Sequence, residues 1–186
     1  EASEAANINA VATVNRQRFA RGEKETYCGH YNEWLVYALL QQGKDASAIV
    51  RNCHAQAVES IKSHTQNPEK SGELLGAWSA ARVVNFLGVD TGEWLVPLAI
   101  SNTLPIETTG AARFMQAHGM LIQHRDDADR ARTALVAMQS IRQESLAAMK
   151  QAEPEKDPHF DDWGMRALER GEALVLLASG EREKGL

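Results

Sequence analysis

Four side chains in the first third of the chain have the chemistry to bind a metal ion or to form a disulfide bond: Cys28, His30, Cys53 and His54. Structural zinc sites pair thiolate and imidazole ligands at short fixed spacings such as Cys-x2-Cys. The spacings here are Cys-x-His and Cys-His, and neighbouring helical residues point about 100° apart. Cys53 and His54 therefore cannot readily reach one ion, and we expect neither a metal nor a cofactor.

The two cysteines are expected to be free thiols. Residues 30–42 and 45–63 are predicted to form a helical hairpin that turns near Gly43. In a straight hairpin of this length Cys28 and Cys53 are offset by about 9 Å along the axis, at about 1.5 Å per residue. A disulfide bond needs Cα atoms within about 7 Å, so it would require a distorted hairpin.

The sequence does not decide the cellular compartment. The cytoplasm is slightly favoured, and a secreted or periplasmic location is allowed if a signal segment was removed.

The remaining titratable residues do not suggest catalysis. His118 and His124 lie on different faces of one predicted helix. Residues 157–162 mix acids with a histidine, but their surroundings resemble a linker, and acid–base catalysis needs groups held within hydrogen-bond distance. The sequence holds no P-loop, dinucleotide fingerprint, nucleophile elbow or His-Glu-x-x-His motif. A non-catalytic protein is therefore favoured.

Composition narrows the class of partner. The chain has 186 residues, 44% of them hydrophobic, and a net charge of −5. This balance fits one domain with a real core over residues 1–186, as a fragment or the C-terminal part of a longer chain. A negative net charge argues against a nucleic-acid partner, which requires a basic face. No window approaches the roughly 20 apolar residues of a membrane span.

Hydrophobic spacing predicts an all-α fold of about seven to nine helices. Trp34 is assigned to the buried stripe of its helix, and Gly88 is expected to end another. Pro97 breaks helical backbone, so a short irregular helix and a loop are expected over residues 89–106. The main predicted helices cover residues 3–21, 30–42, 45–63, 73–87, 109–124, 126–152 and 161–178.

Residues 30–43 read HYNEWLVYALLQQG. This segment resembles the pattern H-x-x-x-W-L-x-Y-A-x-L-Q-x-G of a bacterial group of tetratricopeptide-repeat (TPR)-like proteins. Looser similarity to that group follows at Asp90–Leu98, at residues 129–132 and at Leu177–Glu181. The resemblance implies an α-solenoid of stacked antiparallel helical hairpins in a right-handed superhelix. It also implies a scaffold that binds peptides or proteins along its concave face and performs no reaction.

In such a stack the first helix of each pair lines the concave face, which gives a set of candidate contact residues. Arg82 and the amides would pair with backbone or carboxylate groups, and Tyr37 and Trp78 would hold apolar side chains. The alternative is that both rings pack between repeats and that Arg82 is solvated or ion-paired. The candidate peptide-binding residues are His30, Glu33, Tyr37, Leu40, Gln41, Trp78, Arg82 and Asn85.

Two further hypotheses stay open. The broken helix at Pro97, beside Trp94, suggests a small-molecule-binding or enzymatic pocket near residues 89–106, because irregular backbone often lines pockets. The ends of a solenoid expose apolar surface, so self-association through those ends is the other hypothesis. The partner itself is not identified by the sequence.

Overall fold

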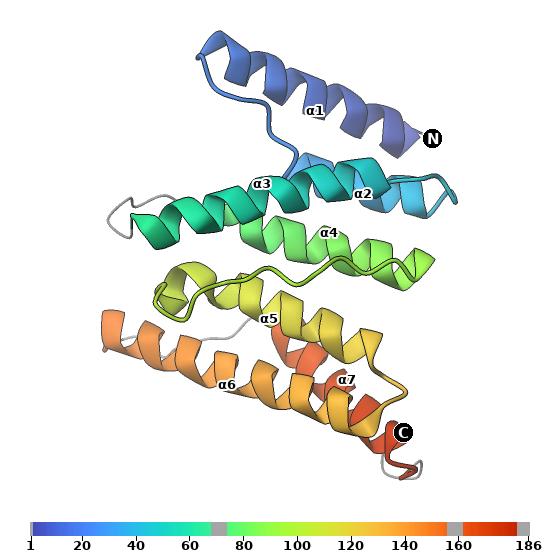
Figure 1. Cartoon of the computed structure of the whole chain (residues 1–186), viewed down its shortest axis with the longest axis vertical. Coiled ribbons are helices and arrows are strands. Elements are labelled where there is room, and N and C mark those ends of the chain that lie inside the picture. Colours follow the sequence, from blue (N-terminus) through green and yellow to red (C-terminus); the bar gives the residue numbers. More distant parts are fainter. Residues whose placement is uncertain (1, 68–73, 156–161, 182–186) are drawn as a thin grey trace. The chain divides into compact units, whose positions relative to one another are not determined.

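The computed structural model describes residues 2–67, 74–155 and 162–181. In these ranges the chain forms seven α-helices and no strand, which confirms the all-α prediction (Figure 1). None of these helices is long and apolar enough to cross a membrane. The helices are α1 (Ala2–Ala20), α2 (His30–Leu40), α3 (Ser47–Gln66), α4 (Leu75–Thr91), α5 (Ile106–Gln123), α6 (Ala128–Ala152) and α7 (Asp162–Ala178).

The chain folds as two compact units, Glu1–Ser101 with α1 to α4 and Asn102–Leu186 with α5 to α7. In the first unit, α2 packs against both α1 and α4, and α3 packs mainly against α4. The spacing of apolar residues predicts one buried face on α3 and its N-cap, formed by Ala46, Ile49, Val50, Cys53, Ala57 and Ile61. All of these are buried except Ile49, which is half-buried.

The prediction that Trp34 is buried is wrong, since 46% of its surface is exposed. Helix α2 instead buries Leu35 and Val36 together with two polar residues, Asn32 and Glu33. These polar residues are buried because the unit supplies partners for them, including the Cys28 carbonyl oxygen for the Asn32 amide at 3.3 Å. The buried face of α2 is therefore rotated away from the face that apolarity alone selects.

Gly88 does not end α4, contrary to expectation. The helix continues to Thr91 and ends at Gly92, which adopts a left-handed conformation with φ of 78°. Gly88 is needed instead for close packing: a Cβ placed there would lie 2.4 Å from the ring of Trp94. The glycine allows that ring to lie directly on the helix backbone.

The short helix expected within residues 89–106 is also absent; after Gly92 the backbone is non-helical up to Pro105. This segment is tied to α3, where Arg51 pairs with Glu93 at 2.6 Å and His54 Nε2 contacts the Val96 carbonyl oxygen at 2.8 Å. Two contacts with α3 thus hold this non-helical segment beside that helix.

The prediction of two free thiols is wrong as well: Cys28 and Cys53 form a disulfide bond, with Cα atoms 4.8 Å apart. The predicted offset assumed that Cys28 continues the line of α2. In fact α2 begins at His30, after Gly29 with φ of 105°. The connector before it runs beside α3, where the Tyr27 amide donates to Gln56 Oε1 at 3.0 Å. This path brings the two cysteines together without distorting a helix.

The second unit is built around one apolar cluster. Helices α5 and α6 form an antiparallel pair, and α7 packs mainly against α6. Small residues permit close approach, since a Cβ on Gly110 of α5 would lie 2.8 Å from the Ser145 hydroxyl oxygen of α6. The spacing on α6 predicts a stripe of apolar or small residues; its members Ala131, Ala134 and Met138 lie in this core, Ile141 packs against it, and Ser145 lies outside the cluster. The buried cluster comprises Phe114, Ala117, Leu121, Ala131, Ala134, Leu135, Met138, Ala167, Leu168 and Val175.

Candidate functional site

Aromatic side chains of α2 and α4 gather on one surface of the first unit. Residues three or four apart on a helix share a face, so each helix contributes one row. Rings from the two rows contact each other, as Tyr37 and Phe86 show with centroids 5.7 Å apart. We call this surface the aromatic ledge; its members are His30, Trp34 and Tyr37 of α2 and Trp78, Arg82 and Phe86 of α4.

The α2 row of the ledge is internally connected. The Trp34 indole N–H donates to His30 Nε2 at 2.8 Å, and the two rings meet edge to face. Trp34 and Tyr37 have centroids 6.4 Å apart and lie at 90° to each other. Their surfaces are 46% and 43% exposed, respectively. The rings are thus fixed by one another and remain open to solvent.

Arg82 fixes the α4 row. Its guanidinium carbon lies 5.0 Å from the centroid of the Trp78 ring and 5.4 Å from that of Phe86. Both distances are within the range of a cation–π interaction. The same guanidinium donates to Glu33 Oε2 at 3.0 Å, which ties α4 to α2.

Glu33 lies beneath the ledge and holds Arg82 in place. Its side chain is buried, and its second carboxylate oxygen accepts a hydrogen bond from the Ser79 hydroxyl at 2.7 Å. The Ser79 oxygen in turn accepts the Gly29 amide N–H at 2.8 Å. A buried carboxylate is tolerated when it is paired and hydrogen-bonded in this way. Because Gly29 follows Cys28, the disulfide bond lies at the end of this chain of contacts.

The predicted contact residues are divided by the fold. Four of them lie on the ledge: His30, Tyr37, Trp78 and Arg82. Glu33 lies beneath it and orients Arg82. Leu40 is buried at the end of α2. Gln41 is exposed at the C-cap of α2, and Asn85 is buried in α4.

Sequence reasoning missed two members of the ledge, Trp34 and Phe86. Trp34 was assigned to the core because apolar residues are usually buried. Phe86 could have been found, because Trp78, Arg82 and Phe86 recur at intervals of four residues and so share a helix face.

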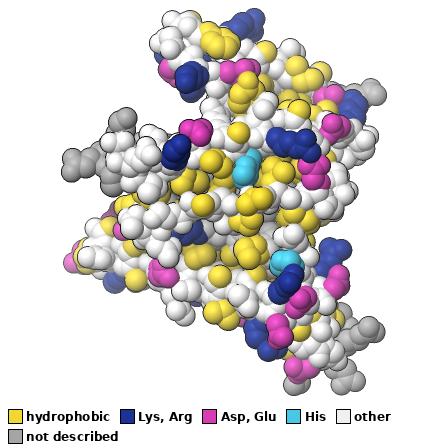
Figure 2. Space-filling model, in the orientation of Figure 1, with side chains coloured by type: hydrophobic (Ala, Val, Ile, Leu, Met, Phe, Trp, Pro, Cys, Tyr) yellow, Lys and Arg dark blue, Asp and Glu magenta, His cyan; other side chains and the backbone are white. Residues whose placement is uncertain are grey.

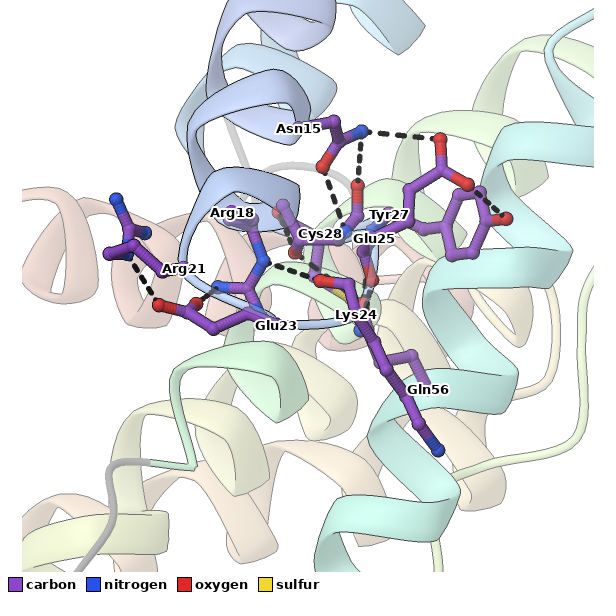
Figure 3. Close-up of polar contacts among 10 residues, drawn as sticks. Asn15, Arg18, Arg21, Glu23, Lys24, Glu25, Tyr27, Cys28 and Gln56 are labelled. Carbon is purple, nitrogen blue, oxygen red and sulfur yellow. Dashed lines mark hydrogen bonds and ion pairs between the residues drawn. The ribbon is translucent and has the colours of Figure 1, made fainter.

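A second feature of this unit is a polar network that holds the connector before α2 (Figure 3). Asn15 of α1 donates to Glu25 Oε1 and to the Thr26 carbonyl oxygen, both at 3.3 Å, and accepts the Thr26 amide N–H at 2.9 Å. On the opposite side the Gln56 amide of α3 donates to the Glu25 carbonyl oxygen at 3.1 Å. The connector therefore links α1 to α3 through paired side-chain amides.

An open groove of about 380 Å³ lies between α1 and α2, beside this network. Phe19 on its rim is 59% exposed, and hydrophobic side chains of α1 are visible at the surface among charged ones (Figure 2). The residues that line the groove are Ile8, Val11, Ala12, Asn15, Arg16, Phe19, Glu25 and Leu35.

The residues considered for metal binding have other roles. The two cysteines share the disulfide bond, His30 accepts from Trp34, and His54 contacts Val96. Within the described ranges no group of three or more His, Cys, Asp or Glu residues is placed to hold a metal ion. The pocket hypothesis for residues 89–106 stays a prediction; there the Trp94 ring packs against Gly88.

Among the described residues of the second unit, His118 is the titratable group whose pKa is perturbed. Burial lowers the pKa of His118, and the nearby Arg170 charge lowers it further. Its ring lies 5.4 Å from that of Trp163, and its Nδ1 is buried without a hydrogen-bond partner in the described part of the chain. The acid–histidine segment at residues 157–161 lies outside the described residues.

Comparison with protein-family models, with curated proteins and with solved structures gives no match. Function must therefore be inferred from the geometry and chemistry of these surfaces.

Proposed function

We propose that this chain is a non-catalytic binding module of TPR-like helical hairpins that holds a peptide segment, or an exposed segment of another protein, on the aromatic ledge. The observation that carries the proposal is the exposure of Trp34 and Tyr37 in direct contact with each other. Contiguous exposed apolar surface on a folded domain commonly marks an interaction site. Tryptophan, tyrosine and arginine are also the residues that dominate binding energy at interfaces.

The rigidity of the ledge supports the same function. Glu33 holds Arg82 and Ser79, and Arg82 holds the Trp78 and Phe86 rings. A surface whose side chains are already ordered loses little conformational entropy when a ligand binds. The motif at residues 30–43 supplies three ledge members on α2, which is the helix that the TPR resemblance assigns to ligand contact.

Selection from a random dodecapeptide library tests the proposal. Peptides enriched on the wild-type chain are titrated against the variant Trp34→Ala/Tyr37→Ala and against the control Trp163→Ala. Trp163 is a suitable control because it is 45% exposed, nearly as much as Trp34, and lies in the other unit. We expect the ledge variant to weaken binding at least about tenfold, and the control to leave it unchanged.

Circular dichroism and thermal melting establish that each variant is folded before binding is compared. Light scattering at several concentrations separately reports self-association, the other partner considered for this chain. Enriched peptides that bind both variants as tightly as wild type would show that the ledge is not the binding surface.

A further inference from the structure

We propose that the ligand of the aromatic ledge is an uncharged, proline-rich segment of a partner protein in the polyproline II conformation. The inference rests on the proposed function and specifies its ligand. Three properties of the ledge carry it: its hydrogen-bond donors, its charge and the arrangement of its rings.

Donors predominate among the polar groups of the ledge that remain available, although the Tyr37 hydroxyl oxygen can also accept. In the described part of the chain, the Tyr37 hydroxyl and the Trp78 indole N–H make no hydrogen bond, and Arg82 donates one, to Glu33. The nearby acceptors are already engaged: His30 Nε2 accepts from Trp34, and the two Glu33 oxygens accept from Ser79 and Arg82.

A ligand that matches such a surface must offer acceptors and few donors. A polyproline II segment has no internal hydrogen bonds, so its carbonyl groups point outward unpaired. Proline also lacks the backbone N–H that would otherwise be buried without an acceptor. An extended segment of ordinary residues presents as many N–H groups as carbonyls and fits this donor set less well.

The ledge also favours a ligand without charge. Its one permanent cation, Arg82, is compensated by the buried carboxylate of Glu33 at 3.0 Å. An acidic ligand would have to compete with that carboxylate for the guanidinium, and a basic ligand finds no exposed acid among the six ledge residues. An apolar ligand needs no charge partner, and it gains the contact area of the rings.

The rings of the two rows form one joined surface, since the Tyr37 and Phe86 centroids lie 5.7 Å apart. A polyproline II helix has three residues per turn, so every third proline of a ligand lies on the side that faces this surface. The perpendicular Trp34 and Tyr37 rings present faces in two orientations, and we expect a pyrrolidine ring to pack against them. Prolines also restrict the free ligand, which lowers the entropy lost on binding.

Fluorescence anisotropy with a fluorescein-labelled L-proline decamer tests this inference. The controls are a D-proline decamer, which has the opposite hand, and decamers of Gly-Ser and of Gly-Glu. We expect the L-proline decamer to bind at least about tenfold more tightly than each control. Tyr37→Phe removes one donor and should weaken binding about five- to tenfold; Trp78→Ala should weaken it more, and Trp163→Ala should leave it unchanged.

Equal binding of the L- and D-proline decamers, or L-proline binding that survives both Tyr37→Phe and Trp78→Ala, would overturn the polyproline II ligand. Selected library peptides that bind the ledge but contain no proline would also overturn it, while leaving the proposed function intact. If neither proline decamers nor library peptides bind the folded wild-type chain, both proposals fail together.

Discussion

The two units of this chain achieve compactness by different means. The unit of α1 to α4 depends on the Cys28–Cys53 disulfide, on the amide network around Asn15 and on the buried Glu33 carboxylate. The unit of α5 to α7 contains no cysteine and is organised around one apolar cluster. The first unit also buries apolar residues, such as Val36, Val50 and Leu87, but it carries Trp34 and Tyr37 of α2 on the surface and adds covalent and polar ties to its core.

This contrast bears on function. Helix α2 buries Asn32 and Glu33 while it exposes Trp34 and Tyr37, the reverse of what burial preferences favour. Departures from the local rules of folding are expected where a surface serves a function rather than stability. No comparable reversal is present among the described residues of α6, whose buried residues are Ala131, Ala134, Leu135 and Met138.

Removal of the disulfide bond should produce the largest difference between the units. Cys28→Ala/Cys53→Ala opens a loop with a sequence separation of 25 residues, which should lower the stability of the first unit by about 3–4 kcal/mol. The second unit should be unaffected, because it shares neither cysteine. Hydrogen exchange followed by mass spectrometry reports each unit separately, and equal loss of protection in both would contradict the contrast.

A cavity in the apolar cluster should destabilise the second unit and leave the stability of the first unit unchanged. Met138 of α6 is fully buried in that cluster, and Met138→Ala should lower the stability of the second unit by about 3 kcal/mol through lost burial and the space left behind. The same exchange experiment should show the first unit retaining its protection. Loss of protection in α2 to α4 would mean that the two units unfold together.

Replacing a helical glycine by alanine should lower stability in the first unit but not in the second, with a smaller effect than the two changes above. Alanine favours a helix over glycine by about 1 kcal/mol. At Gly88 its Cβ would lie 2.4 Å from the rigid Trp94 ring, whereas at Gly171 it would lie 3.0 Å from methyl carbons of Leu121 and Leu135. We expect Gly88→Ala to lower stability by about 2 kcal/mol, and Gly171→Ala to change it by less than about 1 kcal/mol because leucine side chains can rotate away.

A double-mutant cycle identifies the cause at Gly88. If the Trp94 ring is what the new Cβ displaces, Gly88→Ala should cost little more in a Trp94→Ala background, where the ring is gone. Thermal melting of the four proteins gives the coupling. A full cost that persists without the ring would place the conflict elsewhere in the α4 backbone.

The helices could be predicted because their signal is local and periodic. The stripe Val50, Cys53, Ala57 and Ile61 marks the buried face of α3 directly, and its members are buried as expected. The disulfide could not be predicted in the same way. It depends on the path of the connector before α2, which is set by hydrogen bonds to Asn15 and Gln56 on two other helices.

The ledge could be predicted in part for a related reason. Helical spacing places Trp78 and Arg82 on one face whatever lies around them, so that row was accessible. Of the α2 row, His30 and Tyr37 were predicted and Trp34 was not, because the face of α2 that is buried depends on Ser79 and Arg82 of α4 meeting Glu33. The pairing of a buried carboxylate with two partners is a tertiary interaction, and the hydrophobic pattern of the sequence does not predict it.

The smallest effect we expect is a pH dependence confined to the second unit. Burial lowers the pKa of His118 below its usual value of about 6.5, so the unfolded chain binds the proton more readily than the folded one. Stability from this group is therefore present above that pH and is lost as the pH falls through it. The ring faces Trp163, its Nδ1 has no described partner, and the Arg170 charge opposes protonation, so nothing described there compensates the proton.

His118→Gln tests this origin, because glutamine does not titrate. The stability of the second unit is measured by hydrogen exchange between pH 7.5 and pH 5.5. It should fall less steeply with acid in the variant than in wild type. The slope decides the matter, since the variant loses some packing against Trp163 at every pH. Parallel slopes would assign the acid sensitivity to other groups. Buried polar groups would then be shown to matter only in the first unit.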